Sequence, residues 1–362
     1  MEPGAGAQAR DRTLDVLRAV ATVRVVTYHA TGAAVWSWFA AMPAMFFVGG
    51  ALFAGSLERR PAQTVLRERF RRILIPMWAF SATVAVVITV AGAWDEVPLW
   101  GPIGFIIPIS PAMGPRGVDN PLYWTWMGLW YINAYALFMI VGIPLRRLHR
   151  RWPVQTIAVL ATPVVLSGLL RSPGVGALTA NLVFWVLGYS YHDRRNRLPS
   201  SRVLWVTAGV SMTLAIVYAA GASGFHVVTT AIPTLNNLVG LAWVAAAIAA
   251  RRPIAELVSH RWADVTVTFI QARALTIYLW HAAAIGIVGA LAHRVEFLND
   301  HVWARVAVVF PLTLLLVLAL GWIEDLAARR PPKLVPDVRR TIDLRASTPP
   351  ISAGPLVTRT TE

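Results

Sequence analysis

Three ionisable side chains lie along one side of an apolar stretch near the amino terminus, residues 11–29. In a helix, Arg18 and His29 are separated by three turns plus about 20°, so they share a face about 16 Å apart along the axis. Asp15 lies near the same stripe. Charged groups at bilayer depth are costly and usually face a bundle interior or a wet cavity. The stripe therefore predicts a functional face that points inward.

His29 is the candidate general base of this stripe, because imidazole is the side chain that most readily exchanges a proton near neutral pH. The structural alternative is that His29 only forms a hydrogen bond with a neighbouring helix. Asp15 and Arg18 favour the functional interpretation, because three ionisable groups on one stripe of a membrane helix seldom have a purely structural role. Arg24 lies on a different face, where an ion pair or an interface contact is expected.

A basic block, RERFRRILIP, runs over residues 67–76 and includes Arg71 and Arg72. Guanidinium groups pair with phosphates in a bidentate manner, which suits a phosphorylated donor such as coenzyme A. The same cluster is also typical of a cytoplasmic loop or of contact with anionic lipids. Arg71 and Arg72 are the donor-binding candidates, and topology alone remains the alternative.

Two later apolar stretches carry polar side chains: LWYINAY contains Tyr131 and Asn133, and TIYLWH contains Tyr278 and His281. These side chains are expected to complete a polar cavity together with the first stretch, and Tyr278 and His281 share a helix face. Interfacial belt positions are the alternative. Metal and haem sites need clustered ligands, and only His29 and His281 fall within the apolar spans, so no metal site is expected.

The composition indicates a polytopic membrane protein with an all-α fold. Hydrophobic residues make up 56% of the 362 residues and charged residues only 14%, with long apolar runs. The net charge of +15 comes from short arginine clusters between these runs, which fits the positive-inside rule better than nucleic-acid binding. The chain has no cysteine, which excludes disulfides and a cysteine acyl-enzyme.

About ten transmembrane helices are expected, each near the length that a bilayer requires. They run over about 14–35, 38–57, 73–93, 123–145, 154–170, 175–191, 203–220, 228–250, 274–292 and 303–326. Residues 1–12 are expected to form a cytoplasmic tail, 13–328 the transmembrane domain, and 329–362 a disordered cytoplasmic tail. Basic clusters on alternate connections place both termini on the cytoplasmic side of the plasma (inner) membrane. Gly49 and Gly50 are expected to permit close helix packing.

In their order along the chain, five motifs resemble the acyltransferase 3 family of integral membrane acyltransferases. They are LDVLRAVATVRVVTYH, MPAMFFVGGALF, RFRRILIP, LWYINAY and TIYLWH. The resemblance implies that His29 is catalytic with Arg18 as its partner, and that Arg72 lies on the donor side. FFVGG in place of the more usual FFxSG and the additional charge of Arg24 depart from the family pattern.

The resemblance implies an O-acyltransferase that moves an acetyl or other short acyl group from acyl-CoA to a hydroxyl. Acyl-CoA would be a co-substrate rather than a permanently bound cofactor, and the acceptor a carbohydrate, lipid or secondary metabolite of the cell envelope. Membrane lipids are the other expected partners, and nucleic acid is not. A transporter or exporter of a small metabolite is the alternative, since it too would place charges in a wet cavity.

Overall fold

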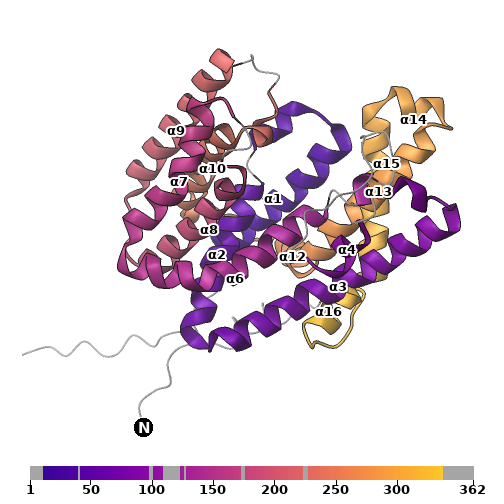
Figure 1. The fold of residues 1–362 in the computed structure, drawn as a ribbon, viewed down its shortest axis with the longest axis horizontal. Helices are drawn as coiled ribbons and strands as arrows, with labels where there is room; N and C mark the ends of the chain where they lie inside the picture. The colour runs from indigo at the N-terminus through magenta and orange to yellow at the C-terminus, as the bar shows by residue number, and fades with distance from the viewer. Residues whose placement is uncertain are drawn as a thin grey trace, which may run out of the picture.

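The computed structural model describes residues 11–39, 41–97, 101–108, 123–125, 128–172, 176–222 and 227–336. The described chain is helical, and ten of its helices have at least 17 residues (Figure 1). These are α1 (Arg12–Thr31), α2 (Met42–Arg59), α3 (Ala62–Ala91), α6 (Leu129–Arg151), α7 (Pro153–Leu169), α8 (Ala177–Arg194), α9 (Ser201–Ala222), α10 (Pro233–Ala249), α13 (Ala274–Ala292) and α15 (Val302–Leu320). Each one overlaps one of the ten predicted spans.

Shorter helices join or extend these ten. They are α4 (Gly101–Ile106), α11 (Arg251–Leu257), α12 (Arg261–Ala272), α14 (Glu296–Asp300) and α16 (Trp322–Ala327), together with the 3₁₀ turns η1 (Ala34–Trp38), η2 (Trp94–Glu96) and η3 (Thr229–Ala231). Two short helices, α11 and α12, precede α13. Most of residues 94–121, between α3 and α6, lie outside the described residues.

Six helical segments in the described chain are long and apolar enough to cross a membrane, or seven if α10 and α11, bent by 67°, form one span. The six include α2, α3, α6, α9, α13 and α15. The predicted number of about ten is therefore not confirmed. Among the helices left out, α7 is only 17 residues long and α1 carries the charged side chains of the opening stripe. Several apolar helices nevertheless indicate an integral membrane protein.

Three helix ends differ from the predicted spans for local reasons. Helix α1 ends at Thr31, because Gly32 adopts a left-handed conformation with φ of 65° and its N–H caps the helix. Helix α15 ends at Leu320, and Gly321, whose Cα lies against the side chain of Arg273, allows the chain to turn into α16. Helix α3 begins at Ala62, so the basic block lies inside the helix rather than at its start.

Two groups of helices lie side by side with α1 between them (Figure 1). Helices α2, α6, α7, α8, α9 and α10 pack together in one group, and α3, α13, α15 and α16 form the other. Helix α1 contacts α2 and α10 of the first group and α13 and α15 of the second. The stripe of ionisable residues thus lies at the junction of the two groups.

Glycine allows the backbones of α2 and α8 to approach closely. A Cβ atom on Gly50 would collide with the carbonyl of Trp185, and one on Gly188 with the carbonyl of Phe47. These atoms belong to the backbone and cannot move aside without shifting a helix. The close packing predicted for Gly50 is confirmed.

Gly50→Ala is expected to destabilise the fold by about 1 to 3 kcal/mol, the usual cost of overpacking a rigid contact. The measurement is the thermal midpoint of the detergent-solubilised protein, followed by size-exclusion chromatography after heating. Gly209→Ala on α9 is the matched control, because its Cβ would meet no atom within 4 Å. An unchanged midpoint for Gly50→Ala would contradict the packing argument.

Candidate active site

A cavity of about 1570 Å³ lies between α1, α2, α3, α6, α12 and α16. Among the described residues, its lining has nine arginine and lysine side chains and five carboxylates, so it favours an anionic ligand. The basic side chains are Arg18, Arg59, Arg60, Arg69, Arg72, Arg195, Arg251, Arg330 and Lys333. Arg59 and Arg60 are exposed to solvent, so the basic end of the cavity is its open end.

Helix α3 supplies one wall through Arg69 and Arg72, which are three residues apart and share a face. The Arg69 side chain is fixed, because its Nη1 donates to the hydroxyl of Tyr135 at 2.9 Å and its Nη2 to Ser56 Oγ at 3.1 Å. Arg71 points elsewhere: its Nε donates to the carbonyl of Ala327 at 2.9 Å, and it does not line the cavity.

Arg18 and Glu324 lie on the cavity wall. Arg18 forms no ion pair within the part of the chain that the structure describes, so its guanidinium is available to a ligand. Glu324 Oε2 accepts hydrogen bonds from the Thr276 amide at 3.2 Å and hydroxyl at 2.8 Å. Burial raises the pKa of the Glu324 carboxyl, while the Thr276 hydrogen bonds and the charge of Arg18 act in the opposite direction.

A row of rings continues from the cavity into the bundle. Tyr131 lines the cavity, and its ring centroid lies 4.9 Å from that of Tyr278. The Tyr278 ring lies 5.7 Å from His281, and His281 lies 5.3 Å from His29. His29 itself is not among the described residues that line the cavity. The rings thus connect the cavity wall with the imidazole of α1.

The two histidines form a hydrogen-bonded pair with nearly parallel ring planes across α1 and α13. His29 Nδ1 and His281 Nε2 are 3.0 Å apart, and the two rings are inclined by only 10°. His281 is fully buried, whereas His29 is half-buried. The rings of Tyr28 and Trp124 lie 5.2 and 5.8 Å from the His29 ring, so two further aromatic side chains lie near it.

The remaining predicted residues divide between the cavity and the packing around it. Asp15 lines the cavity and accepts a hydrogen bond from Arg12 Nη1 at 2.9 Å. Asn133 is buried on α6 but does not line the cavity. Arg24, as expected, points to another face, where its Nε donates to the carbonyl of Trp36 at 2.6 Å and its guanidinium lies 4.9 Å from the Tyr28 ring centroid.

Comparison with known families decides what kind of enzyme this is. Residues 11–322 match the acyltransferase domain of the acyltransferase 3 family. The chain belongs to this family. It is therefore an integral membrane acyltransferase, a transferase that acylates acceptors with groups other than amino-acyl groups. No curated protein and no solved structure gave a significant match.

Several side chains of the acyltransferase cavity were not predicted from the sequence. The sequence did not distinguish Arg69 from the other arginines of its cluster. Only the structure of α3, which begins at Ala62, shows which of these arginines face the cavity. Glu324 lay within an expected span, and its one signal was a carboxylate inside an apolar run. Gln271 lines the cavity, and its side-chain amide donates to the carbonyl of Asp15. Its own stretch of sequence gave no indication of this contact.

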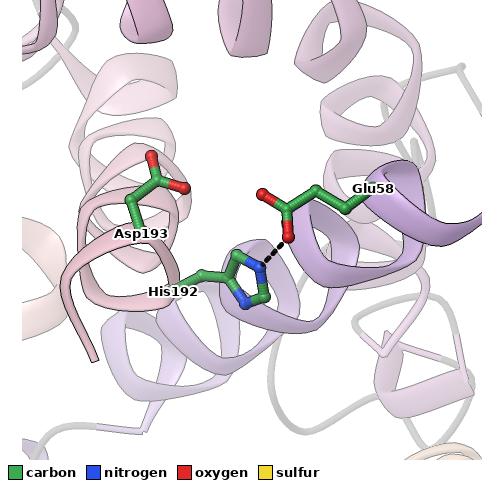
Figure 2. Close-up of side chains that lie close together, drawn as sticks. All are labelled: Glu58, His192 and Asp193. Carbon is green, nitrogen blue, oxygen red and sulfur yellow. Dashed lines mark hydrogen bonds and ion pairs between the residues drawn. The ribbon is translucent and has the colours of Figure 1, made fainter. Parts of the chain in front are cut away.

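The acyltransferase also contains a cluster that could be mistaken for a metal centre. The side chains of Glu58, His192 and Asp193 offer ligand atoms within 4.8 Å of one another, and the Glu58 carboxylate accepts a hydrogen bond from His192 Nε2 at 2.7 Å (Figure 2). However, Arg146 bonds both carboxylate oxygens of Asp193 at 2.6 and 2.5 Å and also Glu58 at 3.0 Å. Arg150 also donates to Glu58 at 3.1 Å, so two guanidinium groups already pair with the two carboxylates, and we assign the cluster to packing between α2, α6 and α8.

Proposed function

We propose that the protein is an O-acyltransferase that moves an acetyl or other short acyl group from acyl-CoA to a hydroxyl group. The observation that carries this proposal is the positively charged cavity with the available guanidinium of Arg18 on its wall. Rings connect that wall to the His29–His281 pair. Family membership supports acyl transfer, and the charge of the cavity supports a phosphorylated donor.

The donor is proposed to enter the cavity at its basic end. Its phosphates would pair with the guanidinium of Arg72 and with Arg330, which comes from the segment after α16 and also lines the cavity. Such charge-assisted pairs are short and strong. The extended arm of the donor then carries the thioester past Arg18 towards the ring of Tyr131. Since basic clusters favour the cytoplasmic side, this opening and both termini are proposed to face the cytoplasm.

The acceptor is proposed to present its hydroxyl to His29. His29 removes the hydroxyl proton, the alkoxide attacks the thioester carbonyl, and the carbon–sulfur bond breaks. The leaving thiolate takes the proton from His29, which returns the base to its starting state. The guanidinium of Arg18 stabilises the negative charge that develops on the carbonyl oxygen. A carbohydrate, lipid or secondary metabolite would each supply a suitable hydroxyl.

The decisive experiment offers labelled acetyl-CoA and longer acyl-CoAs to membranes with and without the protein. Mass analysis then shows which molecule gains the acyl mass, and release of free coenzyme A gives the rate. Protein-dependent ester formation supports the proposal. The alternative, a metabolite transporter, would instead move solute across the membrane without consuming acyl-CoA, and that result would overturn the proposal.

Arg72→Gln is expected to raise KM for the acyl-CoA about 10-fold to 100-fold with a much smaller change in kcat. The reason is that a hydrogen bond to a charged group contributes about 1.5 to 3 kcal/mol, and the phosphates lie far from the reacting carbonyl. Initial rates over a range of donor concentrations give both constants. Arg67→Gln is the matched control, because Arg67 is exposed on the same helix and does not line the cavity. Equal KM values for the two variants would contradict the donor assignment.

A further inference from the structure

We propose that His281 is a positioning residue: it fixes the tautomer of His29, so that Nε2 of His29 is the atom that removes the acceptor's proton. The inference rests on the proposed function, because it assumes that His29 is the general base. It goes further by naming the reacting atom and the side chain that selects it.

The hydrogen bonds of His281 determine its own protonation. His281 Nδ1 lies 3.1 Å from the carbonyl oxygen of Ile277, one turn earlier in α13. A carbonyl oxygen can only accept a hydrogen bond, so Nδ1 of His281 carries the proton. In a neutral imidazole the other nitrogen is then an acceptor. His281 is fully buried and forms no ion pair within the described chain, which favours the neutral ring.

The second step follows from the contact between the rings. His281 Nε2, as the acceptor, faces His29 Nδ1 at 3.0 Å, so Nδ1 of His29 must be the donor. The Nε2 atom of a neutral His29 therefore holds a lone pair. The hydrogen bonds therefore run in one direction: His29 donates to His281, and His281 donates to the Ile277 carbonyl. Because that carbonyl belongs to the main chain of α13, it fixes the direction of both bonds.

The near-parallel planes of the two rings add a restraint on orientation. With the rings inclined by 10°, the hydrogen bond holds the plane of the His29 ring, whose centroid lies 5.8 Å from that of Trp124. The tautomer and the orientation of a catalytic imidazole are commonly set by the partner of its second nitrogen. Without that partner, part of the His29 population would carry its proton on Nε2 and would be unable to act as a base there.

Two substitutions separate positioning from packing. His281→Phe keeps a ring in the site but removes the acceptor. His281→Gln replaces it with an amide, whose oxygen can accept from His29 Nδ1 and whose NH₂ can donate to the Ile277 carbonyl. We expect His281→Phe to lower kcat about 100-fold with KM for acyl-CoA nearly unchanged. The kcat of His281→Gln should be at least tenfold higher than that of His281→Phe.

Nitrogen-15 NMR of histidine-labelled protein supplies a readout that does not depend on activity. The wild-type protein should show an unprotonated Nε2 at His29, assigned by the signals that disappear in His29→Gln. The His281→Phe variant should show a mixture of the two tautomers. An unprotonated Nδ1 at His29 in the wild type would overturn the inference, as would equal kcat values for the Phe and Gln variants.

The two proposals fail in distinguishable ways. If His29→Ala retains acyl transfer, His29 is not the base and the proposed mechanism fails. If His29→Ala is inactive while His281→Phe keeps the wild-type kcat, only the positioning role fails. Monodisperse elution of each solubilised variant, together with its unchanged KM, excludes misfolding as the cause of a low kcat.

Discussion

Replacing His29 with alanine is expected to lower the rate of acyl transfer by a factor of about 10² to 10⁴, towards the background of membranes that lack the protein. A positioned general base contributes rate enhancement of this size, and alanine has no group that can accept the hydroxyl proton. The loss should appear in kcat, because the proposed site for the donor phosphates lies at the basic end of the cavity, away from His29, which does not line the cavity. Release of free coenzyme A with saturating donor is the measurement.

The control for this variant is His293→Ala, which removes an exposed histidine just after α13. It should behave like the wild type in rate and in accumulation in the membrane. Retention of most of the activity by His29→Ala, with the protein present at normal levels, would rule out His29 as the base. The assignment of the cavity to the donor would not be affected by that result.

Glu324→Gln is expected to lower kcat/KM by about 10-fold to 100-fold, the range of a hydrogen bond or contact with a charged group. Glutamine keeps an oxygen that can accept from the Thr276 amide and hydroxyl, but it removes the negative charge that acts on Arg18. Arg18 would then lose a favourable electrostatic interaction with this carboxylate. Steady-state kinetics over both donor and acceptor concentrations measure the effect.

The pKa of Glu324 also predicts how the activity depends on pH. Because burial raises that pKa, the carboxyl takes up a proton at a higher pH than an exposed glutamate, and the protonated form resembles the glutamine variant. Activity that needs the charged form therefore falls as the pH is lowered through the raised pKa. Glu256→Gln, an exposed change on α11, is the control. Wild-type kinetics for Glu324→Gln would show that Arg18 acts without this carboxylate.

The sequence predicted local features best where helix geometry alone determines them. Arg18 and His29 follow from spacing within one helix, and the ten long helices overlap the ten expected ranges. The number of membrane spans did not follow, because charge on α1 and the short length of α7 remove them from the apolar class. Helix ends depended on Gly32 and Gly321, whose effects arise from backbone conformation and packing.

The sequence alone did not predict which residues of distant segments contact each other. His29 and His281 are 252 residues apart. The sequence placed both near one polar cavity but did not indicate that their rings form a hydrogen bond. Arg71 and Arg72 are adjacent, and only the rotation of α3 shows that Arg72 faces the cavity and Arg71 the carbonyl of Ala327. Glu324 was expected within the last membrane span. The structure instead ends α15 at Leu320 and places Glu324 on the separate helix α16, where it lines the cavity.

The structure describes residues 329–336 of the carboxyl-terminal segment. Lys333 bonds through its backbone to Arg273 and Asp325, and Pro336 lines the cavity. Residues 337–362 lie outside the described chain. At the other end, Asp11 lines the same cavity and accepts a hydrogen bond from Tyr191.

Two segments that are far apart in the sequence, at Asp11 and at Pro336, thus form parts of the same cavity wall. Local unfolding of either segment would remove part of that wall. A molecule that binds in the cavity would therefore stabilise both segments at once, and its binding free energy would add to the stability of the fold by mass action.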